Sequence, residues 1–186
     1  GVCQEFEEKI VATLQKLGME DARFEVAITP IDNITPSGTD SIAYLFTANR
    51  TTKPAPIERI ASGGELSRVM LALKALIAEK MMLPTIIFDE IDSGVSGRIA
   101  DAMGDIISSL GENMQVVAIT HLPQVASKGK SHFVVYKEQS TTHLTRLGED
   151  DRITEIAKML SGSQITSAAM SQARILLGVE PKTTLF

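Results

Sequence analysis

Residues 83–94 read LPTIIFDEIDSG, and the order of residue types in this stretch predicts the fold class. The apolar run at 85–88 is typical of a strand buried in a parallel sheet, and it ends in two adjacent carboxylates, Asp89 and Glu90. In α/β proteins, ligands bind at the carboxyl ends of such strands. One of these acids could hold Mg²⁺ while the other orients a water for attack on a phosphate. The plainer alternative is a pair of solvated acids, with Asp92 capping the next turn.

Upstream, residues 61–74 read ASGGELSRVMLALK and predict a helix that is entered through two glycines. Ser62 followed three residues later by Glu65 matches a capping box, which needs no ligand. Gly63 and Gly64 allow backbone N–H groups to approach an anion closely, and the helix dipole favours an anion there. The two interpretations are compatible. In either case, a chain with aspartate in place of Gly64 is expected to fold.

Downstream, residues 115–120 (QVVAIT) predict a second parallel strand that ends at Thr120 and His121. A lone histidine after a strand is usually structural. This one is predicted to share the sheet rim with Asp89 and Glu90, where an imidazole could reach a terminal phosphate.

Strands alternate with helices along the rest of the chain, which indicates an α/β fold with a mainly parallel sheet flanked by helices. Apolar alternation at 23–29 and 41–48 predicts an N-terminal antiparallel strand pair, and residues 49–58 read as a polar linker. Two helices show apolar stripes, at Phe6, Ile10, Leu14 and Leu17 in 3–17, and at Leu66, Val69, Met70, Leu73 and Ile77 in 62–80. Further helices are predicted at 97–110, 123–128 and 165–177, and strands at 132–138 and 141–147. One more helix is predicted to begin at a cap on Asp150 or Asp151 and to run through Leu160.

Composition narrows the function classes. The chain has 186 residues, 44% of them apolar, and a net charge of −5, so it suits one domain that is not by itself a basic DNA-binding platform. Its apolar runs are shorter than the roughly 18–20 residues that span a bilayer. The single cysteine, Cys3, fits a reducing compartment. Gly129-Lys130-Ser131 imitates the end of a P-loop, but Gln124 stands where the first glycine is needed and a strand follows instead of a helix.

Together the motifs resemble the second half of an ABC-type ATPase head. ASGGELSRVMLALK is similar to the ABC signature motif, TIIFDE to the Walker B strand, DSGVSG to the D-loop and ITH to the switch-histidine loop. The chain more closely resembles the RecN family of bacterial DNA-repair ATPases, relatives of the structural-maintenance-of-chromosomes (SMC) proteins. That resemblance rests on GGELSRVMLALK, FDEIDSGVSGR, THLPQVAS, HFVVYKE and RITEIAKMLSG, and it extends from about residue 14 to 178.

This resemblance implies the carboxyl-terminal half of a P-loop NTPase head of the ABC type. Residues 1–18 would be the end of a returning coiled-coil arm, residues 19–180 the carboxyl-terminal lobe, and residues 181–186 a tail. The P-loop would lie on a separate amino-terminal lobe, so the fragment alone is expected to be inactive. The full-length protein would be a cytoplasmic, nucleoid-associated ATPase in double-strand-break repair. Its partners would be DNA and a second head in an ATP-sandwiched homodimer, with no membrane partner.

The resemblance also implies residue roles, with ATP and Mg²⁺ as cofactors. Asp89 would hold Mg²⁺, Glu90 would be the catalytic base, and His121 would contact the γ-phosphate. The residues implied at the nucleotide of the opposing head and at the dimer interface are Ser62, Gly63, Gly64, Glu65, Ser93, Gly94 and Val95. The sequence SGVSG departs from the Ser-Ala-Leu-Asp pattern of ABC transporters, which puts the D-loop contacts in doubt.

Two other function classes remain open from the sequence. A metal-dependent phosphoesterase could use Asp89, Glu90, Asp92 and His121 as a self-contained site. A non-catalytic interaction module with a degenerate ATPase fold is the other, although an intact set of Asp89, Glu90 and His121 argues against degeneracy.

Overall fold

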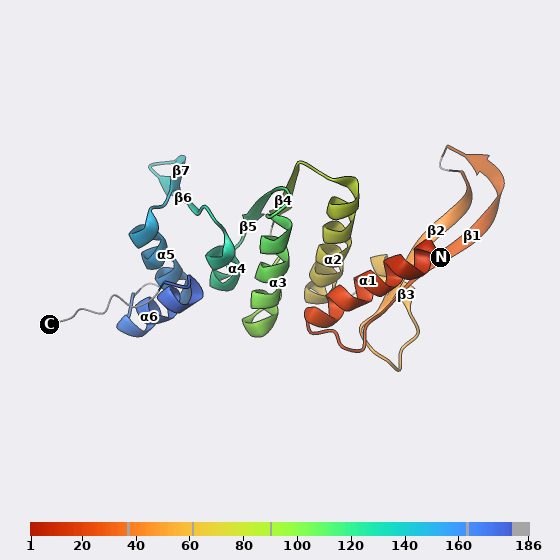
Figure 1. The fold of residues 1–186 in the computed structure, drawn as a ribbon, viewed down its shortest axis with the longest axis horizontal. Helices are drawn as coiled ribbons and strands as arrows, with labels where there is room; N and C mark the ends of the chain where they lie inside the picture. The colour runs from red at the N-terminus through yellow and green to blue at the C-terminus, as the bar shows by residue number, and fades with distance from the viewer. Residues whose placement is uncertain (37, 61, 90, 163, 180–186) are drawn as a thin grey trace. The chain divides into compact units, whose positions relative to one another are not determined.

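The computed structural model describes residues 1–36, 38–60, 62–89, 91–162 and 164–179 (Figure 1). It confirms a mixed α/β chain, with helices and strands in the predicted order. The chain divides into two compact units, the first made of residues 1–86 and 91–95 and the second of residues 87–90 and 96–186. The predicted boundary at residue 18 remains a prediction. Among the described residues, no helix combines the length and apolar character that crossing a membrane requires.

The first unit begins with helix α1 (Val2–Lys16), whose apolar face forms part of the core. Ile10, Leu14 and Leu17 are fully buried, which confirms the stripe predicted from their spacing. Leu17 is the C-cap, and the chain then turns at Gly18, whose φ is 78°. Glycine adopts this left-handed conformation without strain, so the helix ends where the sequence predicts.

Strands β1 (Arg23–Thr35) and β2 (Gly38–Thr47) form the predicted antiparallel pair. The alternating apolar residues face each other across the strands, as the pairs Phe24–Phe46, Val26–Tyr44 and Ile28–Ile42. Phe24 and Phe46 are buried, whereas the Ile28–Ile42 pair is more than half exposed. The part of the pair near α1 therefore contributes to the core.

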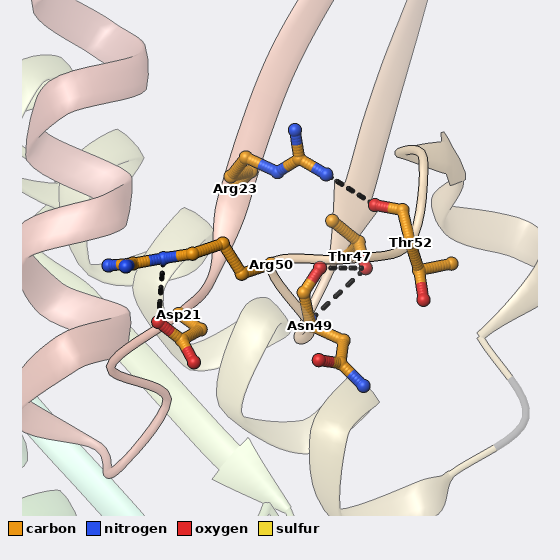
Figure 2. Close-up of polar contacts among 6 residues, drawn as sticks. All are labelled: Asp21, Arg23, Thr47, Asn49, Arg50 and Thr52. Atoms are coloured by element: carbon orange, nitrogen blue, oxygen red, sulfur yellow. Dashed lines mark hydrogen bonds and ion pairs between the residues drawn. The ribbon is translucent and has the colours of Figure 1, made fainter.

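The segment after β2, which the sequence predicts as a polar linker, is held in place by side-chain contacts. Arg50 Nε lies 3.1 Å from Asp21 Oδ1, and the Arg23 guanidinium donates to the Thr52 carbonyl (Figure 2). Strand β3 (Ala55–Pro56) then returns to pair with β2. These contacts fix the path of the backbone into the 3₁₀ helix η1 (Ile57–Arg59) and on toward helix α2 (Gly63–Met81).

Helix α2 buries a different set of residues from the stripe predicted by its sequence. Leu66 and Ile77 of the predicted stripe are 38% and 43% exposed, so these two residues do not belong to the core. The residues that α2 buries are Val69, Leu71, Ala72, Leu73 and Ala78. Val69, Ala72 and Leu73 share one cluster with Ile10 and Leu14 of α1, so the face that meets α1 is rotated from the predicted stripe.

Strand β4 (Thr85–Asp89), whose residues 87–89 belong to the second unit, pairs with strand β5 (Gln115–Ile119). Helix α3 (Gly97–Leu110) lies in the connection between them and contacts β5. A helical connection of this length is what parallel neighbours need. Phe88 of β4 is fully buried, whereas Ile87 is 60% exposed, so the two faces of the strand differ sharply.

The remainder of the second unit combines a hairpin with three helices. Strands β6 (Phe133–Glu138) and β7 (Thr141–Arg146) form the predicted hairpin, which follows helix α4 (Pro123–Lys128). Helices α5 (Glu149–Ser161) and α6 (Ser167–Leu176) pack through Ile153, Ile156, Ala157, Ala169 and Ala173. The N-cap of α5 is Gly148, so the predicted cap at Asp150 or Asp151 is wrong. Both acids instead lie in the first turn, where their negative charges interact favourably with the positive end of the helix dipole.

Candidate functional site

The signature turn, residues Ser62–Glu65, is a capped helix N-terminus. The Ser62 hydroxyl accepts a hydrogen bond from the Glu65 N–H at 3.4 Å, and the Ser62 carbonyl accepts from the Leu66 N–H at 3.0 Å. The predicted cap is therefore confirmed. The N–H groups of Gly63 and Gly64 lie in the first turn, where a helix supplies no carbonyl of its own. The turn is thus stabilised from within and still suited to an anion.

The two glycines of the turn have different surroundings. A Cβ atom on Gly63 would find no described atom outside the adjoining chain within 4 Å, so this residue faces open space. A Cβ atom on Gly64 would lie 2.9 Å from the carbonyl oxygen of Gly94, a distance that side chains essentially never adopt. The expectation that aspartate is accommodated at Gly64 is therefore wrong, because the D-loop backbone occupies that space.

Residues Ser93–Val95, which the resemblance assigns to a D-loop, belong to the same unit as the signature turn. Gly94 has a φ of 72°, which favours glycine, and the Val95 N–H donates to the Asp92 carbonyl at 3.2 Å. Asp92 is fully buried, and the N-cap of α3 is Ser96, so Asp92 does not cap that helix. The tight turn over 92–95 directs Asp92 into the protein and places Gly94 against Gly64.

Asp89 and His121 lie at the ends of two paired strands, and both residues belong to the second unit. Asp89 is the last residue of β4 and is exposed, and His121 comes two residues after the end of β5 and is also exposed. The Thr120 hydroxyl accepts from the Leu122 N–H at 3.0 Å, which shapes the turn around His121. Glu90 lies outside the described residues. Both described side chains are therefore accessible to a ligand, and the Asp89 carboxylate is of the type that Mg²⁺ prefers.

Sequence reasoning missed how α4, the helix after His121, is held. Lys128 Nζ lies 2.7 Å from Asp105 Oδ1 and 3.1 Å from Asp101 Oδ1, and the hydrogen bond with Asp105 raises the pKa of Lys128. From the other side, Arg152 Nη2 donates to the Ser127 carbonyl at 2.8 Å. Helices α3 and α5 thus both anchor α4, although the sequence shows these residues only as isolated charges.

Glu90, one of the four residues of the alternative phosphoesterase site, lies outside the described residues. Across the described ranges, no group of three or more His, Cys, Asp or Glu side chains is arranged to hold a metal ion. Asp92 is fully buried, whereas Asp89 and His121 are exposed. The described geometry therefore offers no support for a self-contained metal site.

Comparison with known proteins identifies close relatives in sequence. The DNA repair protein RecN of Rickettsia typhi is 43% identical over 179 residues, which cover 94% of this chain and 32% of that protein. RecN of Haemophilus influenzae is 37% identical over 175 residues, covering 91% of this chain and 31% of the relative. The chain thus spans about a third of the length of the curated relatives it matches, in their carboxyl-terminal portion. No family model matches the chain.

Solved structures with a similar fold are SMC heads. The Smc head domain with a coiled coil and joint from Pyrococcus yayanosii has a TM-score of 0.67 at 17% identity, covering 85% of this chain and 29% of that chain. An SMC ATPase studied for ATP-driven dimerization and DNA-stimulated activation has a TM-score of 0.62 at 15% identity, covering 88% of this chain and 96% of that chain. At these identities the likeness shows the fold alone.

Proposed function

This chain belongs to the RecN family, and we propose that it forms the carboxyl-terminal lobe of an SMC-like ATPase head that acts in recombinational repair of DNA double-strand breaks. The observation that carries the proposal is the contact between Gly64 and Gly94. A capped helix N-terminus and a glycine turn from 30 residues later meet through their backbones. A helix cap alone does not require that arrangement. Such close packing of two backbones would suit a surface that receives a nucleotide bound to a second head.

The catalytic roles follow from the chemistry of each side chain. Asp89 would hold Mg²⁺, Glu90 would orient and deprotonate the attacking water, and His121 would hydrogen-bond the terminal phosphate of ATP. Mg²⁺ neutralises charge that develops on the phosphates during transfer. The exposure of Asp89 and His121 is compatible with these roles.

The signature turn would act on ATP held by a second copy of the head. The N–H groups of Gly63 and Gly64, the Ser62 hydroxyl and the positive end of the α2 dipole are suited to a γ-phosphate. Glu65 supports the turn, and Ser93, Gly94 and Val95 would lie at the interface between the two heads. The open space at Gly63 supports this role, because a ligand needs room on that side of the turn.

The lobe that carries the P-loop would cover the exposed face of the β4–β5 pair. Ile87, Val117 and Ile119 are 60%, 41% and 53% exposed on these strands. Exposed apolar residues that cluster on a sheet are typical of an interaction surface. We assign this surface to the amino-terminal lobe of the same protein, since the relatives are about three times longer than this chain.

The chain alone is expected neither to bind ATP tightly nor to hydrolyse it, because no segment of it matches a P-loop. The full-length protein would work in the bacterial cytoplasm at the nucleoid, as a homodimer of heads that binds DNA. Isothermal calorimetry of the 186-residue chain with Mg²⁺–ATP tests the first statement. Micromolar binding would contradict it.

A mixing experiment with the full-length protein tests the composite site. Gly63→Asp places a negative charge in open space at the signature turn, so the variant should fold and bind ATP on its own P-loop but not hydrolyse it. A P-loop lysine variant should also be inactive. Mixing the two should restore one functional site per dimer and hence ATPase activity.

The matched control for the mixture is Lys74→Asp, an exposed position on the same helix, which should keep wild-type turnover. Absence of recovery, when both variants are folded and associate, would count against a pocket shared between heads.

A further inference from the structure

Arg68 joins two segments that are 47 residues apart in sequence. Its Nε donates to the carbonyl of Gly64 at 2.9 Å, and its Nη1 donates to the carbonyl of Leu17 at 3.1 Å. Gly64 belongs to the signature turn, and Leu17 is the C-cap of α1. All three residues belong to the first compact unit. One guanidinium thus bridges the end of α1 and the start of α2.

Both acceptors suit a charged, forked donor. The last carbonyls of a helix have no partner within that helix, so the Leu17 carbonyl requires a donor from elsewhere, and a cation is favoured at this end. Leu17 is fully buried and Arg68 is half-buried, so water competes weakly for these bonds. The planar guanidinium can hold two acceptors in a fixed geometry, which a lysine ammonium on a flexible stem does not reproduce.

The surrounding contacts make this bridge rigid. Ile10 and Leu14 of α1 share a core cluster with Val69 and Leu73 of α2. The same helix is tied to β1, because the Glu7 carboxylate accepts from the Val26 N–H at 2.7 Å. A displacement of the end of α1 therefore acts on Arg68 directly.

The signature turn passes the constraint on to the D-loop. The carbonyl of Gly64 is held by Arg68, and the α-carbon side of Gly64 faces the carbonyl of Gly94 without room for a methyl group. Movement of Gly64 must therefore move Gly94 or open a gap between them. The end of α1, the signature turn and the D-loop form a continuous series of contacts.

We propose that Arg68 is a positioning residue that links the end of α1 mechanically to the signature turn, so that a change at α1 alters the geometry of Gly63 and Gly64. Its consequence for catalysis rests on the function proposed above. Arg68 would act through the turn and would not itself touch the nucleotide.

Hydrogen exchange on the 186-residue chain tests the link without any nucleotide. Arg68→Met should raise exchange by about tenfold in two separate segments, the amides of residues 17–19 and those of residues 65–66, with β1 and β2 unchanged. Arg68→Lys keeps the charge and most of the stem, and it should restore protection in one segment at most. Lys74→Met removes an exposed positive charge from the same helix and should change neither segment.

A double-mutant cycle then separates a link from a merely structural contribution. Gly18→Ala strains the residue after the α1 cap, whose φ is 78°, and should loosen the end of α1. With Arg68 present, this change should also raise exchange at residues 65–66. In the Arg68→Met background it should no longer do so, because the connection is missing.

Turnover of the full-length protein gives a second readout. Arg68→Met should lower kcat several-fold and leave KM for ATP unchanged, because the P-loop on the other lobe holds the nucleotide. The exchange result does not depend on whether the composite ATP site exists, so the two proposals can fail separately. Additive effects of Gly18→Ala and Arg68→Met at residues 65–66, or uniform loss of protection through the first unit in both Arg68 variants, would overturn the proposed link.

Discussion

Gly64 packs so closely against Gly94 that a Cβ atom on Gly64 would lie 2.9 Å from the Gly94 carbonyl oxygen. A Cβ atom on the neighbouring Gly63 would instead point into open space. The two adjacent glycines therefore differ, because a side chain is excluded at Gly64 but has room at Gly63. Gly64 lets the D-loop backbone approach, whereas Gly63 leaves room beside the helix N-terminus.

This difference predicts opposite effects of the same substitution on stability. Gly64→Ala should lower the free energy of unfolding by ~1–3 kcal/mol, because the methyl group forces the backbone of the D-loop or of α2 to shift. Gly63→Ala should be neutral or stabilise by up to ~1 kcal/mol, as alanine does in a helix. Urea denaturation of the two variants measures both values. Equal midpoints for the two variants would show that the Gly94 backbone can shift away from the added methyl group with little loss of stability.

Ser62 should contribute to both stability and activity. Ser62→Ala removes the hydroxyl that accepts from the Glu65 N–H and should cost ~0.5–2 kcal/mol. Thr166→Ala is a matched control, since the Thr166 hydroxyl caps α6 by accepting from the Ala169 N–H at 3.1 Å. Both variants should lose similar stability in denaturation, but only Ser62→Ala should lower ATP turnover in the full-length protein. A similar loss of turnover in both variants would show that Ser62 acts only as a helix cap and has no separate role in ATP turnover.

Glu90→Gln should separate ATP binding from hydrolysis in the full-length protein. The amide keeps the shape of the side chain but cannot act as a carboxylate base, and general-base contributions are typically ~10²–10⁴-fold. ATP binding should persist, so head dimers should accumulate in ATP and be visible by light scattering. Asp89→Asn, which weakens the proposed Mg²⁺ ligand, should reduce dimer formation as well. Near wild-type hydrolysis by the Glu90 variant would show that Glu90 is not the catalytic base.

His132 should make the second unit less stable in mild acid. Burial lowers the pKa of His132 below its ordinary value of 6.5, and the charge of Arg152 lowers it further. The unfolded chain therefore takes up a proton near pH 6.5 that the folded chain binds only at lower pH. The free energy of unfolding should fall as the pH drops below about 6.5, until the folded pKa is passed.

Denaturant midpoints at about pH 7.5 and 5.5 measure this dependence. His132→Gln should reduce the difference between the two midpoints, and His143→Gln, which alters a histidine stacked on Tyr136, serves as the control. An unchanged pH difference in His132→Gln would mean that other groups cause the acid sensitivity.

Local sequence patterns were sufficient to predict most elements and part of the site. The alternation of Phe24 and Val26 with Tyr44 and Phe46 correctly predicts the β1–β2 pair, because a period of two places these residues on one face whatever surrounds them. The helix at 97–110 and the cap at Ser62 depend likewise on residues close in sequence. The order of the motifs correctly predicts the family.

Tertiary contacts decided the rest, because they join segments too far apart for any local pattern to report. The buried face of α2 depends on where α1 packs, so Leu66 and Ile77 are exposed despite their helical spacing. The sequence by itself determined that Gly63 and Gly64 stand at the start of a helix and that Asp92 follows a strand. Only the folded chain places Gly94 against Gly64 and buries Asp92. It also brings Arg68 to the Leu17 carbonyl, because a buried helix end needs a hydrogen-bond donor that its own residues cannot supply.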